Sequence, residues 1–227
     1  MLRALSREPE GVTVAGLSSE TGLDRAVLYR LLATLGEDGY VVRDERSRKY
    51  RLGVALIELG ARAARGLEVR RHALPGMRAL MEQARETVCL AVREGDDVVI
   101  VDRLEPSGRQ VRVGYPVGLR HAISDGVLGR ALLLPADGAV SASDASADRS
   151  HGFAVANSDG VVAIASPIRD HAGEAVASVS LIVPDARVHD PALLGHPVRA
   201  LAQEISRRIG YEGVVNRAQN GRVGELA

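Results

Sequence analysis

Hydrophobic residues near the start of the chain recur at helical spacing. In segment 25–37 the leucines fall on one side of a helix drawn at about 100° per residue: Leu28, Leu31, Leu32 and Leu35. The opposite side carries Ala26 and Arg30, and Asp24 can cap the first turn. The pattern predicts an amphipathic helix with one face for packing and one face left free.

Shorter patterns surround this helix. Residues 1–7 form the stub of a first helix, and Thr13 can cap a second helix that ends at Gly22. Two short strands and the charged tip between them follow the amphipathic helix, at 40–43, 49–52 and 44–48. The predicted order is a helix stub, two capped helices and a basic hairpin.

The rest of the chain alternates between helical and strand patterns. A helix at 54–65 is followed by another at 68–85, where Pro75 removes one backbone donor and should kink or divide it. The later elements are a hairpin over 88–104 that turns at 95–97, a third strand at 109–115, a helix at 125–134, a second hairpin over 161–183 that turns at 171–173, and a closing helix at 191–209. These elements predict an α+β domain around a largely antiparallel sheet flanked by helices.

The same patterns divide the chain into parts. We expect a winged helix-turn-helix at 1–52, a linker helix at 53–67 and a larger domain at 68–211. Segment 135–150 is small, polar and without periodicity, and segment 212–227 lacks an apolar face. Both segments are therefore expected to be unstructured.

Composition indicates a globular protein. Hydrophobic residues make up 46% of the 227 residues, which is enough to build real cores. Acidic Glu8 and Glu10 near the start argue against a signal peptide, and no apolar run approaches the length of a membrane span, so we expect a cytoplasmic protein. The single cysteine, Cys89, excludes an internal disulfide and a multi-cysteine zinc module.

Charge is distributed unevenly although the formal net charge is zero. Residues 1–71 contain 13 Arg and Lys and 10 Asp and Glu, whereas the remainder contains 16 and 19. A weakly basic first part joined to a weakly acidic second part suits contact with nucleic acid at one end only.

A helix, a turn, a second capped helix and a basic hairpin within about 50 residues outline a winged helix-turn-helix. A recognition helix must bury one face and present the other to the major groove, where an arginine can bind guanine and a small residue permits close approach. The residues expected to contact DNA are Ser18 and Ser19, then Arg25, Ala26, Tyr29 and Arg30 in the recognition helix, and Arg46, Arg48 and Lys49 in the hairpin. Winged helices also dock proteins, and Asp44 and Glu45 add negative charge to the hairpin, so a protein-interaction module is the alternative.

Four segments resemble the IclR family of bacterial transcriptional regulators. The segment LDRAVLYRLLATLGEDGYVVRDERSRKYRLG is similar to the DNA-binding signature of the family, and LIELGARAARGLEVRRHALPGMRALMEQARETVCLAV to its linker. The segments VGLRHAISDGVLGRALLL and GVVAIASPIRDHAGEAVASVSLIVP are similar to landmarks of its effector domain. The resemblance implies a sequence-specific DNA-binding regulator with a GAF-like or profilin-like domain that binds a small organic effector, a carboxylic or aromatic acid.

The chain departs from the family pattern where an effector would bind. Between Leu134 and Gly152 the family has a few dozen residues, whereas this chain has only the short polar segment. Positions that carry polar residues in small-acid binders hold Ala156, Ala163, Ser180 and Ile182, and Ser124 replaces a frequent histidine. We therefore expect an effector site that is more apolar than those of the small-acid binders. The residues expected to form it are Ile123, Ser124, Val127, Leu128, Ala163, Ser178 and Ser180. A regulator that has lost effector binding is the alternative.

The two serines of the last strand have two possible environments. Ser178 and Ser180 share one face at a period of two, while Val179 and Leu181 take the other. Two hydroxyls on one face could bind a carboxylate, or they could belong to an ordinary solvent face. The sequence does not decide between these environments.

Chemistry other than binding has no support in the pattern. Serines, histidines and acids are present, yet no nucleophile elbow, phosphate loop or metal-ligand spacing brings them together. We expect no catalytic residues, no metal and no cofactor. The expected partners are double-stranded DNA with a palindromic operator, a small-molecule effector and further copies of the chain in a homodimer or homotetramer, because one recognition helix covers only a few base pairs.

Overall fold

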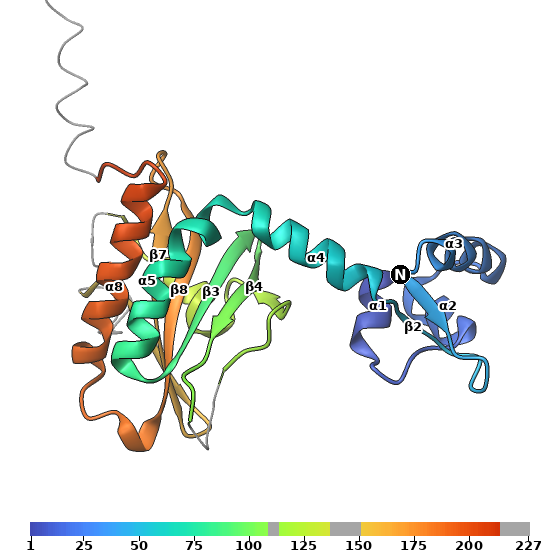
Figure 1. The fold of residues 1–227 in the computed structure, drawn as a ribbon, viewed down its shortest axis with the longest axis horizontal. Helices are drawn as coiled ribbons and strands as arrows, with labels where there is room; N and C mark the ends of the chain where they lie inside the picture. Colours follow the sequence, from blue (N-terminus) through green and yellow to red (C-terminus); the bar gives the residue numbers. More distant parts are fainter. Residues whose placement is uncertain (109–113, 137–150, 214–227) are drawn as a thin grey trace, which may run out of the picture. The chain divides into compact units, whose positions relative to one another are not determined.

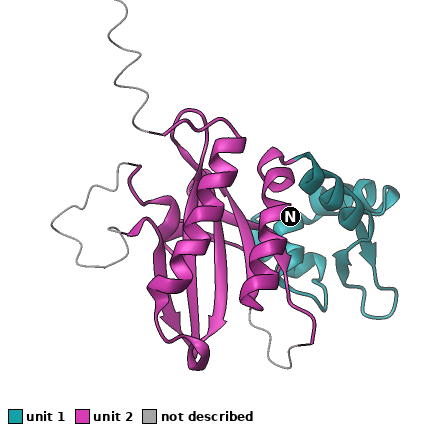
Figure 2. Cartoon of the chain, turned by 60° about the vertical axis from the view of Figure 1, so that its left-hand side comes forward, with its two compact units in different colours: residues 1–66 teal, residues 67–227 magenta. Residues whose placement is uncertain are grey.

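The computed structural model describes residues 1–108, 114–136 and 151–213, and the chain divides into two compact units (Figures 1 and 2). The first unit is Met1–Gly66 and the second is Leu67–Ala227. Each has its own buried hydrophobic cluster or clusters. Within the described ranges, no helix has the length and apolar character needed to cross a bilayer.

The first unit is a winged helix-turn-helix. Its elements are α1 (Leu2–Arg7), α2 (Val14–Thr21), α3 (Arg25–Glu37), β1 (Val41–Arg43), β2 (Tyr50–Leu52) and α4 (Ala55–Gly66). The Thr13 side chain caps α2 by accepting a hydrogen bond from the Gly16 N–H, and Gly22 ends that helix at a φ of +70°. The Asp24 carboxylate accepts from the Ala26 N–H at 2.7 Å and caps α3. The predicted caps are confirmed.

Fewer leucines of α3 are buried in the core of this unit than the sequence pattern suggested. Leu17, Leu28 and Leu32 are buried, but Leu31 is 41% exposed and Leu35 is only partly buried. The expectation that all four leucines of α3 face the core was therefore wrong for Leu31. Around the helix this residue lies about 100° from Leu32, at the edge of the buried stripe.

The second unit is an α+β domain. Its elements are α5 (Glu68–Ala84), β3 (Thr87–Glu94), β4 (Asp97–Leu104), β5 (Arg120–Ala122), α6 (Gly126–Leu132), β6 (Ala154–Ser158), β7 (Val161–Arg169), β8 (Ala175–Pro184), the 3-10 turn η1 (Asp185–Arg187) and α8 (Pro191–Arg208). Six strands form one sheet in the order β5-β4-β3-β8-β7-β6, and every neighbouring pair is antiparallel. The predicted α+β class is confirmed, and α5 continues as one helix through Pro75.

The two faces of this sheet bury different side chains. Helices α5 and α8 lie side by side over one face, as Figure 1 shows, and contact large residues such as Leu90, Ile164 and Leu181. Helix α6 packs on the opposite face, where the strands contribute mostly small residues: Cys89, Ala91, Ala163, Ala165 and Ala175. Side chains alternate between the faces because successive residues of a strand point to opposite sides. The face under α6 is called the α6 face below.

Both predicted hairpins are present, with turns after Glu94 and after Arg169. Of the predicted third strand at 109–115, residues 109–113 lie outside the described part, and Gly114 and Tyr115 are not in a strand. The edge strands β5 and β6 were not predicted from the sequence. Most of the segments expected to be unstructured, 137–150 and 214–227, also lie outside the described residues.

Candidate DNA-binding and effector sites

The free face of α3 presents the side chains expected to enter the major groove. Arg25, Ala26 and Arg30 are exposed, and Tyr29 is 55% exposed. Their helix is fixed from the other side by the fully buried Leu28. Neither the Arg25 nor the Arg30 guanidinium group forms an ion pair with another described residue. The helix therefore holds two arginines ready to donate hydrogen bonds outward.

The two serines of α2 differ in what their hydroxyls do. The Ser18 hydroxyl donates to the Leu23 carbonyl at 2.7 Å, and this bond closes the turn between α2 and α3. Its only proton is thus used within the protein, whereas Ser19 is exposed. The structure gives Ser18 a part in shaping the turn and leaves Ser19 accessible.

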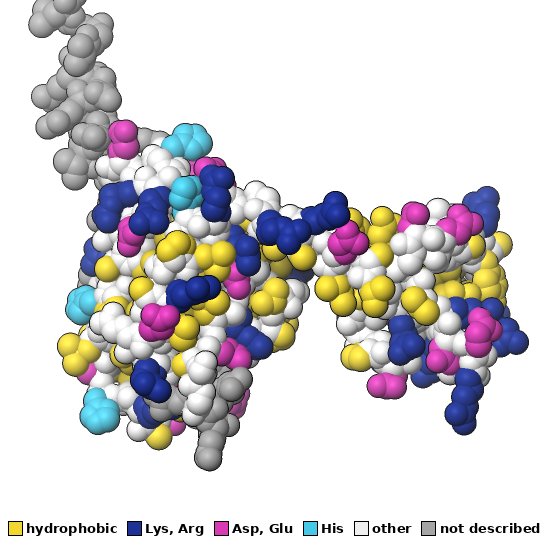
Figure 3. All heavy atoms as spheres, in the orientation of Figure 1, with side chains coloured by type: hydrophobic (Ala, Val, Ile, Leu, Met, Phe, Trp, Pro, Cys, Tyr) yellow, Lys and Arg dark blue, Asp and Glu magenta, His cyan; other side chains and the backbone are white. Residues whose placement is uncertain are grey.

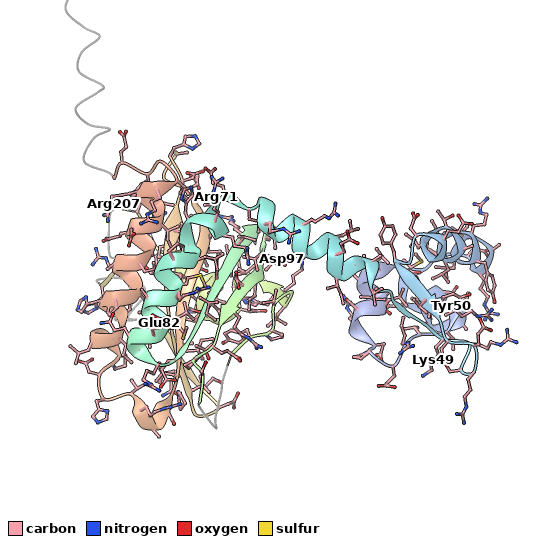
Figure 4. The ribbon with its side chains drawn as sticks, viewed as in Figure 1. Lys49, Tyr50, Arg71, Glu82, Asp97 and Arg207 are labelled. Atoms are coloured by element: carbon pink, nitrogen blue, oxygen red, sulfur yellow. The ribbon has the colours of Figure 1, made fainter. Side chains whose placement is uncertain are left out.

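The tip between β1 and β2, residues 44–49, carries the basic residues of the wing. Arg46 and Arg48 are exposed, and Lys49 is partly buried and immediately precedes the first residue of β2, Tyr50 (Figure 4). In the space-filling view, basic side chains in dark blue protrude from this part of the first unit (Figure 3). Arg48 adopts a φ of +57°, a left-handed conformation that a non-glycine residue adopts only rarely.

A carboxylate organises the same tip. Oδ1 of Asp44 accepts hydrogen bonds from the Arg46 N–H at 3.1 Å, the Ser47 N–H at 2.7 Å and the Ser47 hydroxyl at 2.8 Å. The Ser47 backbone and then its hydroxyl hold the pKa of Asp44 below its ordinary value. From the sequence, Asp44 was expected only to add an unfavourable negative charge to the hairpin. The Asp-x-x-Ser spacing, which is typical of side-chain to backbone capping, was the signal available for its role.

On the second unit, most residues expected to bind an effector lie together on the α6 face. Val127, Leu128 and Ala163 are buried in one cluster, and Ile123 packs against it. Gly129 allows helix α6 to approach residue 123 closely, because a Cβ at this position would be only 2.1 Å from the Ile123 carbonyl oxygen. Ser124 does not join the cluster, since it is exposed and its hydroxyl donates to Asp125 at 3.1 Å.

Ser178 and Ser180 are fully buried on this face. In the sheet, Ser180 is opposite Cys89 and Ala165, and Ser178 is opposite Ala91. Neither hydroxyl has a hydrogen-bond partner among the described residues. The alternative that these serines belong to an ordinary solvent face is therefore excluded. Their two unsatisfied hydroxyls lie on a buried face of the sheet, among small side chains.

Two other polar groups near this face, the Cys89 thiol and the Arg169 guanidinium, are neutral or satisfied. Burial raises the pKa of the Cys89 thiol to about 11, so the thiol is protonated at neutral pH. Arg169, which sequence reasoning did not single out, is buried on β7 and donates to the Gly173 carbonyl at 3.0 Å and to the Leu134 carbonyl just beyond α6. The arginine thus fixes the chain that follows α6.

These features define a class of protein. The chain joins a winged helix-turn-helix with an exposed recognition helix to an α+β domain with polar groups buried under a helix, and this combination is typical of a ligand-sensing DNA-binding regulator. Family models agree. The model of the IclR helix-turn-helix domain matches residues 1–45, and that of the bacterial transcriptional regulator IclR C-terminal domain matches residues 61–145 and 143–207. The chain belongs to the IclR family.

Individual proteins show the same relationship. The HTH-type transcriptional regulator KipR of Bacillus subtilis (strain 168) is 28% identical over 228 residues, which cover 88% of this chain and 90% of that protein. The crystal structure of an IclR transcriptional regulator from Alicyclobacillus acidocaldarius matches with a TM-score of 0.76 at 24% identity, over 91% of this chain and 94% of that one. An IclR homolog from Microbacterium hydrocarbonoxydans, crystallised with 4-hydroxybenzoate, matches with a TM-score of 0.63 at 23% identity, over 88% and 91%. The chain is a DNA-binding transcriptional regulator with a C-terminal effector domain, and not an enzyme.

Proposed function

We propose that the protein regulates transcription by binding a specific operator, with α3 in the major groove and the wing against phosphates. The observation that carries this proposal is the free face of α3, where Arg25 and Arg30 form no ion pair among the described residues. An arginine in this position can bind guanine through two parallel hydrogen bonds. Arg46, Arg48 and Lys49 would contact phosphates, which position the protein without specifying sequence.

A binding titration with DNA from the region upstream of the gene tests the proposal across a series of salt concentrations. Affinity should fall steeply with salt, because binding to phosphates releases counterions. Arg30→Ala should weaken the cognate site by about tenfold or more and random DNA far less, since a bidentate base contact contributes about 1–3 kcal/mol of discrimination. Arg78→Ala removes an equal charge from an exposed position of the second unit and should change neither affinity.

Two outcomes would overturn this assignment. Equal loss on cognate and random DNA would make Arg30 a phosphate contact. An absence of DNA binding at moderate salt, together with a stable complex with another protein, would favour a winged-helix interaction module.

We further propose that the α6 face binds a small organic effector, a carboxylic or aromatic acid. The two buried hydroxyls, which have no hydrogen-bond partner in the described part of the chain, support this assignment, because an unsatisfied buried hydroxyl is costly unless a ligand completes its hydrogen bonds. The alanines and Cys89 around them contribute only small side chains to this face. A structural neighbour was crystallised with 4-hydroxybenzoate, which makes hydroxybenzoates suitable first probes.

Titration of the full chain with hydroxybenzoates and short aliphatic acids tests this part. A bound acid should raise the unfolding temperature of the wild type and change its affinity for DNA, because an effector acts only through different affinities for two arrangements. Ser180→Ala should reduce both effects, whereas Ser166→Ala should leave them in place, since the Ser166 hydroxyl already donates to the Gly152 carbonyl at 2.9 Å. No response from any acid would favour a regulator without an effector.

We also propose a homodimer, or a tetramer built from dimers, that binds a palindromic operator. Helix α4 supports this proposal because it buries none of its residues, while Val54, just before it, and Ile57, within it, are 79% and 74% exposed. Isolated helices of this length are marginal in water, so a second copy covering this apolar side would stabilise it. Sedimentation of the full chain should give at least a dimer, and Ile57→Glu should lower the association constant. A monomeric wild type that still binds its operator would refute the dimer.

A further inference from the structure

The wing tip contains two acidic residues in a region proposed to contact phosphates. Asp44 and Glu45 are adjacent, but the structure treats them differently. Asp44 accepts three hydrogen bonds through one oxygen, whereas Glu45 is exposed and has no hydrogen bond or ion pair in the described part of the chain. Two neighbouring carboxylates of equal charge are thus a matched pair with different surroundings.

Asp44 belongs to a closed network of bonds. Its N–H donates to the Lys49 carbonyl at 2.8 Å, and its own carbonyl accepts from the Arg48 N–H at 2.8 Å. The Ser47 hydroxyl donates to the Asp44 carboxylate and also accepts from the Lys49 N–H at 3.4 Å. The backbone between Asp44 and Lys49 is therefore fixed from both sides, including the left-handed residue Arg48.

We infer that Asp44 is a positioning residue for DNA binding: it holds the wing tip in the conformation that points Arg46, Arg48 and Lys49 toward phosphates, and this gain exceeds the repulsion between its charge and DNA. The inference rests on the proposed contact between the wing and phosphates. Without the carboxylate, three donors lose their acceptor, and only the backbone hydrogen bonds between Asp44 and residues 48 and 49 still hold the left-handed turn. The basic side chains would then have to be ordered at the moment of binding, which lowers affinity.

The two possible roles of Asp44 predict effects of opposite sign. If the carboxylate acted only as a charge, its removal would strengthen DNA binding, because a negative group near phosphates is unfavourable. If it positions the tip, Asp44→Ala should weaken binding although the protein becomes more positive. Asn keeps the accepting oxygen and lacks the charge, so Asp44→Asn should restore affinity to the wild-type level or above it.

The test measures the affinity of the full-length protein for a short duplex of arbitrary sequence by fluorescence anisotropy at two salt concentrations. We expect Asp44→Ala to weaken binding about fivefold, Ser47→Ala to weaken it less, and Glu45→Ala to strengthen it by about twofold at low salt. Circular dichroism of each variant should show an unchanged helical signal, because the tip lies outside both the helices and the core.

The outcomes separate this inference from the proposed function beneath it. If Arg48→Ala and Lys49→Ala leave affinity unchanged, the wing does not contact phosphates and the proposed function is wrong in that part. If those variants weaken binding while Asp44→Ala strengthens it as Glu45→Ala does, the wing contact stands and the positioning role of Asp44 is refuted. If Asp44→Asn bound DNA as weakly as Asp44→Ala, an accepting oxygen at this position would not be sufficient to hold the tip, and the inference would be refuted.

Discussion

The two buried serines of β8 allow a prediction that opposes the usual effect of core substitutions. Ser178 and Ser180 are fully buried, and their hydroxyls have no partner in the described residues. A buried hydroxyl without a hydrogen bond costs about 1–3 kcal/mol, and alanine removes the hydroxyl while keeping the Cβ. We therefore expect Ser180→Ala to stabilise the ligand-free second unit by about 1 kcal/mol, and Ser178→Ala to do the same.

Ser206→Ala is the matched control. Ser206 is also buried, but its hydroxyl accepts from the Arg169 N–H at 2.9 Å and donates to the Ala202 carbonyl at 2.7 Å. Its removal leaves the buried Arg169 N–H without its acceptor, so this substitution should destabilise the unit by about 1–3 kcal/mol. Three Ser-to-Ala changes in one domain are thus expected to differ in sign because of their hydrogen bonds.

Scanning calorimetry on purified, ligand-free protein measures the difference. A gain of about 1 kcal/mol corresponds to a rise of about 2–4 °C in the unfolding temperature of a domain of this size. The same Ser180→Ala variant should show a smaller rise on addition of an effector acid, so stability and binding change in opposite directions. If Ser180→Ala lowered the unfolding temperature as Ser206→Ala does, the hydroxyl would be satisfied without a ligand and the reasoning would fail.

Three further predictions concern the cores. Leu28→Ala should destabilise the first unit by about 3 kcal/mol, because the side chain is fully buried, and should abolish DNA binding; an unchanged first-unit melting curve would contradict the assigned packing. The Cys89 thiol has a pKa of about 11 in the folded protein and ionises near its ordinary value of 9.0 when unfolded. Between about pH 9 and pH 11 the wild type should therefore lose about 2–3 kcal/mol of unfolding free energy relative to Cys89→Ala. Denaturant titrations across this pH range measure the difference, and parallel pH profiles for the two proteins would refute the prediction. Gly195→Ala should destabilise the second unit by about 2 kcal/mol, because the added Cβ would lie 2.3 Å from the ring of Phe153, and an unchanged calorimetric midpoint would count against that contact.

Local signals in the sequence were sufficient to predict much of the fold. The caps at Thr13 and Asp24, the left-handed Gly22 and the hairpin turns depend on neighbours within a few residues, so their positions could be predicted. Strands β5 and β6 were missed because an edge strand is defined by the partner with which it pairs. The partner of β5 is β4, and β6 pairs with β7.

The candidate sites show the same limit. The alternation in β8 predicted that Ser178 and Ser180 share a face, but not that α6, about 50 residues earlier in the chain, covers that face. The sequence likewise places Ser18 on the helix that precedes α3, while its bond to the Leu23 carbonyl depends on the turn between the helices. Contacts between distant segments therefore decided which of the predicted residues are available to a ligand.

Strand β8 is buried on both sides, and from residue 177 onward its odd and even positions contact different parts of the domain. Ala177, Val179 and Leu181 pack under α5 and α8, while Ser178 and Ser180 lie under α6. If the α6 face binds the effector as proposed, a substitution at Ser178 or Ser180 would change what the domain recognises without altering the packing under α5 and α8. Related regulators could therefore diverge in the signals they detect through single substitutions in this strand, without a compensating change elsewhere in the core.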